Sequence, residues 1–146
     1  MIRFDESGWP VVVVHFEGST TDDEFVAYLE RLNELLARKQ SYAIVLNATH
    51  AHFTPLRHQR MQADWLRHHK GELTQLSAGI AFVFAVRIFR LVVTGVFMLQ
   101  PPPAPHRVCA TLADGVRWAA AQVGVEPNAS QLAWDPEETT RPNQRR

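Results

Sequence analysis

The chain has 146 residues, the size of a single domain that can bury a hydrophobic core of its own. Its 15 basic and 15 acidic residues cancel, so the composition lacks the positive field typical of nucleic-acid-binding proteins, and no nucleic-acid partner is expected. The only cysteine, Cys109, has no partner for an internal disulfide, and the first residues do not show a signal-peptide pattern, so we expect one domain in the cytoplasm.

The first part of the chain predicts a hairpin followed by a helix. Two β-rich runs, residues 2–4 and 11–16, flank a sequence with turn chemistry, as in an antiparallel hairpin. Thr21 to Glu24 then form a capping-box pattern, in which the threonine oxygen accepts from an amide and Glu24 reaches back to the cap's own N–H. The apolar residues that follow repeat at helical intervals, which predicts a helix over 21–39.

The middle of the chain predicts buried strands joined by helices. The nearly continuous apolar run 42–46 is typical of a central strand covered on both faces. Thr54 and Pro55 predict the N-cap and first residue of a helix that runs to about Lys70, with Gly71 as its candidate end. A second buried strand is expected over 78–86.

The last part of the chain predicts one more strand and one more helix. Residues 107–110 have the composition of a short strand, and a second capping box opens a helix over 111–124 that Gly124 ends. From residue 126 onward the periodicity is lost, so residues 126–146 are expected to form a mobile tail, with Leu132 and Trp134 as its docking points.

The stretch "RIFRLVVTGVFMLQPPPAPH", residues 87–106, is the most apolar part of the chain. Its polar positions Arg87, Arg90 and Thr94 step by three and four, which favours a helix over 88–99 rather than a strand. Such a helix is about 18 Å long, well short of the roughly 30 Å hydrocarbon core, so no transmembrane segment is expected. Its other positions are apolar around most of the circumference: Ile88, Phe89, Val92, Val93, Val96, Phe97 and Leu99. One flank can pack on the sheet, and the other needs a different cover.

The predicted order of elements is ββαβαβαβα, a mixed β-sheet of about five strands with four helices. With the stretches "VVVVHFEGSTTDDEFVAYLERL", "YAIVLNAT", "GIAFVFAV" and "PPPAPHRVCATLADGVRWAA", it resembles the STAS family, the anti-sigma-factor antagonist fold. The resemblance is to the branch of small stand-alone bacterial proteins of unknown or lipid-related function. It implies an α/β STAS-like domain over residues 1–125, followed by the tail.

The resemblance also implies a regulatory site. In that family a serine or threonine at the start of the second helix, usually in an Asp-Ser setting, is phosphorylated by a partner kinase. The matching stretch here, "HFTPLRHQR", lacks Asp-Ser and has Thr54 as its nearest hydroxyl. Thr54 is therefore interpreted as a helix cap, with the phosphoacceptor as the alternative, since a phosphate there would meet the helix dipole and Arg57.

Metal and catalytic chemistry have little support in the residue pattern. His50 and His52 could point the same way along an extended strand, with His58 nearby, as weak candidates for metal ligands. No cysteine or carboxylate stands at recognised metal spacing, and neither a phosphate-binding glycine loop nor a nucleophile elbow is present. We therefore expect no metal, no cofactor and no enzymatic activity.

Two functional hypotheses remain. In the first, the chain is a non-catalytic regulatory or protein-interaction module whose apolar helix, 88–99, packs against a partner, most simply a second copy in a homodimer. In the second, the same helix covers a cavity or lies on a membrane surface, and the protein binds a lipid or another apolar small molecule.

Overall fold

The computed structural model describes residues 1–52, 54–87, 90 and 101–134. Their elements in chain order are β1 (Ile2–Gly8), β2 (Val11–Gly18), α1 (Asp22–Ala37), β3 (Tyr42–Ala51), α2 (Leu56–His68), α3 (Lys70–Leu76), β4 (Ser77–Val83), β5 (His106–Cys109), α5 (Leu112–Val123) and α6 (Ala129–Leu132).

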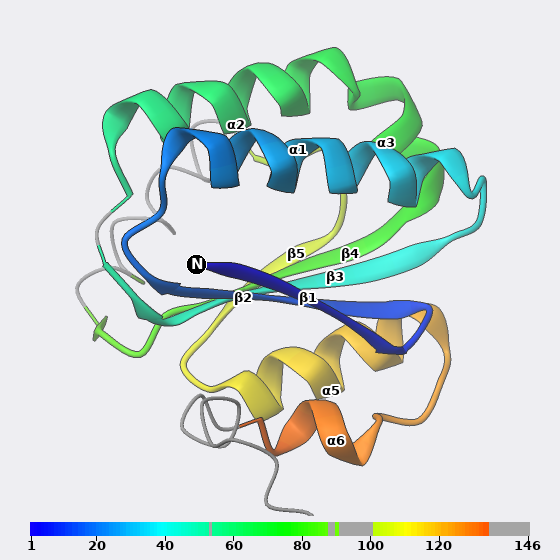
Figure 1. The fold of residues 1–146 in the computed structure, drawn as a ribbon. Helices are drawn as coiled ribbons and strands as arrows, with labels where there is room; N and C mark the ends of the chain where they lie inside the picture. Colours follow the sequence, from blue (N-terminus) through cyan, green and yellow to red (C-terminus); the bar gives the residue numbers. More distant parts are fainter. Residues whose placement is uncertain (53, 88–89, 91–100, 135–146) are drawn as a thin grey trace, which may run out of the picture.

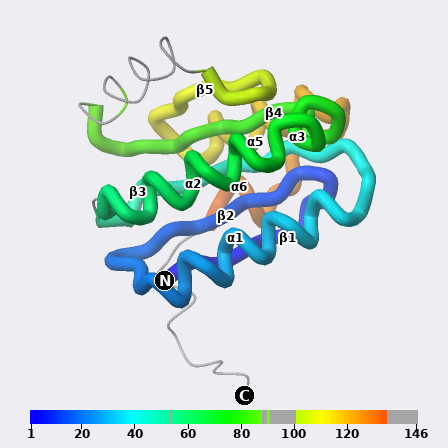
Figure 2. The backbone as a smooth tube through the Cα atoms, turned by 90° about the horizontal axis from the view of Figure 1, so that it is seen from above, coloured from blue at the N-terminus to red at the C-terminus, as the bar shows by residue number. Residues whose placement is uncertain are grey.

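The strands form one five-stranded mixed sheet in the order β1-β2-β3-β4-β5, which confirms the predicted sheet. β1 is antiparallel to β2, whereas β2, β3, β4 and β5 are parallel to one another. Helices α1, α2 and α3 cover one face, and α5 and α6 cover the other (Figure 1). Seen from the first face, α1 lies along the β1–β2 side, with α2 and α3 toward β3 and β4 (Figure 2). Because the parallel strands point the same way, their ends at Gly18, Ala51, Val83 and Cys109 share one edge, here called the carboxyl edge.

Alternation along β2 divides the hydrophobic core into two layers. Val12 and Val14 pack under α1, in a cluster with Tyr28 and Leu35, whereas Val11 and Val13 pack under α5. All four valines are at most 2% exposed, because a central strand of a doubly covered sheet has no solvent face. The valine run of the sequence therefore supplies both layers at once.

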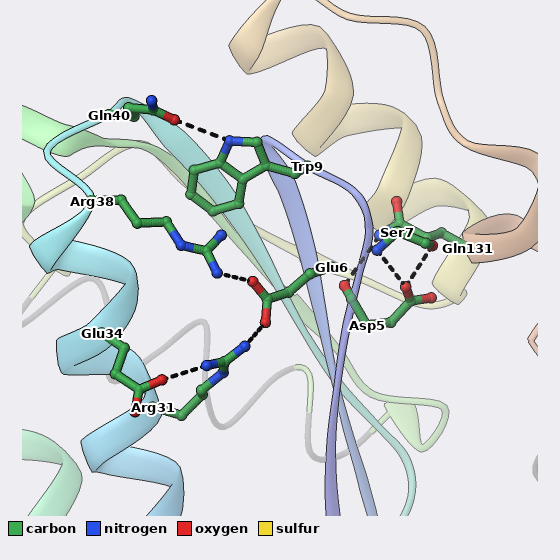
Figure 3. Close-up of polar contacts among 9 residues, drawn as sticks. All are labelled: Asp5, Glu6, Ser7, Trp9, Arg31, Glu34, Arg38, Gln40 and Gln131. Carbon is green, nitrogen blue, oxygen red and sulfur yellow. Dashed lines mark hydrogen bonds and ion pairs between the residues drawn. The ribbon is translucent and has the colours of Figure 1, made fainter.

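A partly buried carboxylate, Glu6, attaches the hairpin to α1 and its C-terminal end. Both Arg31 and Arg38 donate hydrogen bonds to Glu6, and the Arg38 guanidinium also lies 4.3 Å from the ring centroid of Trp9 (Figure 3). Trp9 Nε1 in turn donates to Gln40 Oε1 at 3.2 Å. Burial alone would raise the pKa of Glu6, but the two arginine hydrogen bonds outweigh it and lower the pKa. These contacts hold β1 against the helix that follows it.

Two helix ends differ from the sequence prediction. Thr21 caps α1 by accepting from the Glu24 amide at 3.2 Å, as expected. However, the Glu24 carboxylate lies 3.2 Å from the Met1 ammonium, because a full positive charge attracts it more strongly than a peptide N–H does. Only half of the predicted capping box is therefore formed.

The second predicted helix is divided in two. His69 has φ −102° and ψ 15°, which interrupts the helix between α2 and α3. Gly71 was expected to end the helix, and this prediction is wrong, since Gly71 lies inside α3. The break lies between α2 and α3, ahead of β4. The strand β4 itself ends at Val83, whereas the sequence predicted its end at residue 86.

Two sequence predictions fall wholly or partly beyond the described residues. The apolar helix over 88–99 lies there, with the exception of Arg90. Of the expected tail, residues 126–134 are described: α6 lies on the same face of the sheet as α5 (Figure 1), and Trp134 stacks on His15 of β2. Residues 135–146 are not described. Within the described part of the chain, no helix is both long enough and apolar enough to cross a membrane.

Candidate functional site

Within the described residues, three helices begin at the carboxyl edge, each after the strand that precedes it. These are α1 after β2, α2 after β3 and α5 after β5 (Figure 1). In open α/β sheets, ligands and partners bind outside the carboxyl ends of the strands, where loops and helix N-termini converge. This edge is therefore the candidate functional region, and it carries a polar cluster on each face of the sheet.

Thr54 lies at this edge, ahead of α2, and is exposed. Its carbonyl accepts a hydrogen bond from Gln59 Nε2 at 2.8 Å. The prediction that Thr54 caps the helix is wrong: the N-cap is Pro55, with φ −57° and ψ 148°, and no side chain caps α2. The extended ψ of Pro55 delays the helix by one residue, so that Leu56 is its first residue. The role of Thr54 as a phosphoacceptor stays a prediction.

The first cluster joins the starts of α1 and α2. His58 Nε2 and Arg57 Nη1 each lie 2.8 Å from an oxygen of Asp22, in the first turn of α1. His58 is 2% exposed and stacks on Phe25, with ring centroids 4.6 Å apart and planes 9° apart. Since the carboxylate only accepts, His58 carries a proton on Nε2. The cluster holds the two helix N-termini together and explains why a histidine is buried in a surface helix.

The three histidines considered as metal ligands have three different surroundings. His50 lies near the ring of Trp134, His52 Nδ1 lies 3.1 Å from Ser19 Oγ, and His58 contacts Asp22. Among the residues that the structure describes, no group of three histidine, cysteine or acidic side chains could hold a metal ion. The geometry therefore adds no support to a metal site at these positions.

The second cluster lies on the α5–α6 face and was missed by sequence reasoning. His15 and Asn47, each 1% exposed, lie side by side in β2 and β3, with His15 Nδ1 3.0 Å from Asn47 Nδ2. Trp134 stacks on His15 with ring centroids 3.7 Å apart. A signal was present in the sequence, because each polar residue directly continues an apolar strand run, "VVVVH" and "AIVLN".

Cys109, at the end of β5, is 5% exposed, and burial raises the pKa of its thiol. A thiol with a raised pKa and little exposure is unreactive, so Cys109 packs in the core as a small apolar residue.

Comparison with solved structures identifies the fold. The chain is similar to the crystal structure of an uncharacterized protein from the DUF3478 family with a SpoIIAA-like fold, from Shewanella loihica PV-4. The TM-score is 0.60 at 11% sequence identity, over 82% of this chain and 92% of the other. No protein-family model and no curated protein matches the sequence.

The chain therefore has a STAS-like, that is SpoIIAA-like, α/β fold, as the sequence resemblance implied. At 11% identity the similarity establishes the fold and not a shared activity. The apolar residues Ile88, Phe89, Val92, Val93, Val96, Phe97 and Leu99 stay a predicted interaction surface, outside the described residues.

Proposed function

We propose that the chain is a non-catalytic regulatory or protein-interaction module, and that it associates with a second copy through the apolar segment 88–99. The observation that carries the proposal is the position of this segment: it follows β4 at the carboxyl edge, where exposed apolar side chains already gather. Leu56, the first residue of α2 after β3, is 59% exposed, and Val86, three residues after the end of β4, is 51% exposed. Exposed apolar residues concentrated at one edge are typical of an association surface.

Arg90 is the residue of 88–99 that the structure describes, and it contacts the end of β4. Arg90 Nη1 donates to the carbonyls of Phe84 and Ala85, at 2.9 Å each. Its guanidinium is thereby directed to backbone carbonyls at the end of β4, whereas a membrane-surface role would direct it to lipid headgroups. This contact supports association with a protein over binding to a membrane.

The energetic scale suits a dimer. A two-fold axis pairs the surface with itself, so one apolar patch is sufficient for both partners. Burying about 400 Å² of apolar surface contributes on the order of 10 kcal/mol before the cost of association is subtracted. A gain of this order is comparable with the cost of association, so we expect a weak to moderate homodimer.

The test is the molar mass in solution, measured by light scattering across a range of protein concentrations. We expect a dimer for the wild type and a folded monomer for Val93→Glu and Phe97→Glu, because each introduces a charge into the proposed interface. Val125→Glu is the matched control: Val125 is 38% exposed, but it follows α5 at the opposite edge, so this variant should remain dimeric.

A wild type that is monomeric at every concentration contradicts the proposal, as does dissociation of the Val125→Glu control. Native mass spectrometry of the same samples distinguishes the alternative. A monomer that carries a co-purified lipid would overturn association and favour a lipid-binding function for the same segment.

A further inference from the structure

The second polar cluster of the carboxyl edge is part of a row across three strands. Arg3 of β1 is the register partner of His15 in β2, and His15 is the register partner of Asn47 in β3. Val14 and Phe16, the neighbours of His15, pack under α1. Because strand side chains alternate between faces, the row Arg3, His15 and Asn47 lies on the opposite face, under α5 and α6.

The hydrogen bonds of Asn47 define the protonation of His15. Thr49 donates to Asn47 Oδ1 twice, from its backbone N at 3.3 Å and from Oγ1 at 2.8 Å, which identifies the amide oxygen. The amide nitrogen therefore faces His15 Nδ1, at 3.0 Å, and donates to it. A neutral imidazole that accepts at Nδ1 carries its proton at Nε2.

This Nε2–H is a buried donor without an acceptor. His15 is 1% exposed, and its Nε2 has no hydrogen-bond partner among the residues that the structure describes. Buried side-chain donors in folded proteins nearly always have a partner, which is supplied by water or a ligand when the protein does not supply it. The strand row thus presents an open hydrogen-bonding position at the edge where ligands of α/β folds bind.

The charges around His15 favour one kind of acceptor. Arg3, its cross-strand neighbour, is half-buried and has no ion pair within the described part of the chain. Two more titratable groups act electrostatically on His15, namely Asp5 and His50. Asp5 Oδ1 already accepts from Ser7 N at 2.9 Å and from Ser7 Oγ at 2.6 Å. Arg3 attracts an anion and Asp5 repels it, so this position accommodates a singly charged anion better than a doubly charged one.

The indole ring of Trp134 covers the imidazole of His15. Trp134 stacks on His15 with planes 16° apart, at the end of the arm that contains α6. Gln131 Nε2 anchors the arm by donating to the carbonyl of Val11, at 3.0 Å. It also donates to the carbonyl of Asp5, at 3.3 Å (Figure 3). Leu132 of the same arm packs in the layer under α5, so the arm is held from both sides. Since His15 Nε2 is buried beneath the stacked indole, a ligand reaches it only when the indole is displaced.

We propose that Arg3, His15 and Trp134 form a binding site for a small organic monocarboxylate. One carboxylate oxygen accepts from His15 Nε2–H and the other faces the Arg3 guanidinium, since cross-strand partners are close enough for one carboxylate to reach both. The short apolar body of the ligand lies against the indole of Trp134. This site is separate from segment 88–99 and does not depend on the association proposed above.

The test is a titration with acetate at constant ionic strength, followed by NMR correlations of the histidine ring nitrogens and carbons. His15→Phe, which keeps an aromatic ring under Trp134, identifies the His15 signals by their loss. We expect a protonated Nε2 without ligand and a saturable shift of that nitrogen with acetate. Inorganic phosphate should produce a much smaller shift, because Asp5 opposes a second negative charge.

Two arginine variants make the test specific. Arg3→Gln should weaken acetate binding by about tenfold or more, whereas Arg60→Gln, an exposed arginine of α2, should leave it unchanged. A His15 proton on Nδ1, no saturable shift with acetate, equal losses in the two variants, or tighter binding of phosphate than of acetate would each overturn the proposal.

Discussion

The buried side chain of His15 makes the stability of the fold depend on pH. Burial lowers the pKa of His15 from 6.5 to about 4, Arg3 and His50 act in the same direction, and Asp5 opposes them. Between these values the unfolded chain takes up the proton before the folded chain does, so stability falls as the pH falls. This contribution is fully present above pH 6.5 and decreases by about 3 kcal/mol toward pH 4.

Replacing this histidine should therefore flatten the acid side of the stability profile. His15→Gln removes the titrating group, so its free energy of unfolding should change less between pH 6.5 and pH 4 than that of the wild type. Urea unfolding at several pH values measures the difference. His68→Gln, an exposed histidine of α2, is the control and should keep the wild-type slope; an unchanged slope in His15→Gln would contradict the assignment.

At the scale of elements, the packing of α5 on the sheet depends on the absence of a side chain at Gly115. A Cβ there would lie 2.8 Å from Val83 Cγ2 and 3.2 Å from Val45 Cγ1, both in the buried layer under α5. Gly115→Ala should destabilise the protein by about 1–3 kcal/mol, because overpacking a closed core outweighs the better helix propensity of alanine.

Gly71→Ala in α3 is the matched control for this helix substitution. Among the described residues, no side chain or other part of the fold lies within 4 Å of its added Cβ, so the propensity term alone remains, and stability should rise by up to about 1 kcal/mol. Thermal or urea unfolding of the two variants separates the effects. Equal stability changes of the same sign would show that α5 does not approach the sheet as closely as described.

At the scale of the whole molecule, the sheet predicts an uneven distribution of local stability. β2 and β3 have strands on both sides and helices on both faces, and Val12, Val13 and Val45 are fully buried. Their amides should exchange most slowly with solvent, near the limit of global unfolding. The short edge strand β5 and the four-residue α6 should exchange faster. Hydrogen exchange measured by mass spectrometry or NMR checks this order, and protection of β5 equal to that of β2 would contradict it.

The sequence predicted most of the elements because their signals are local. Thr21 and Thr111 were expected to cap helices, and both accept from the amide three residues later, Glu24 and Asp114. The hairpin and the buried strands likewise follow from short apolar runs. The start of α2 was predicted one residue early, since Thr54 and Pro55 fit a cap and a first residue in type but not in the backbone angles they adopt.

The same sequence could not show which polar residues meet. His15 and Asn47 are separated by 32 residues, Gln131 and Val11 by 120, and Asp22 and His58 by 36. These pairs depend on strand register and helix placement, which no local pattern encodes. Glu24 shows the limit of a local signal: its carboxylate was predicted to accept from the N–H of Thr21, but it lies beside a charge that is distant in sequence, the Met1 ammonium.

What the sequence by itself determined is most of the strands and helices, their buried faces and the resemblance to a STAS-like fold, because alternation, helical spacing and caps act over a few residues. Only the tertiary structure decided that the starts of α1, α2 and α5 share the carboxyl edge and that Arg3, His15 and Asn47 form one row under Trp134. The physical reason is that such contacts arise from the register of neighbouring strands and from the closing of the chain on itself, where residues distant in sequence become nearest neighbours.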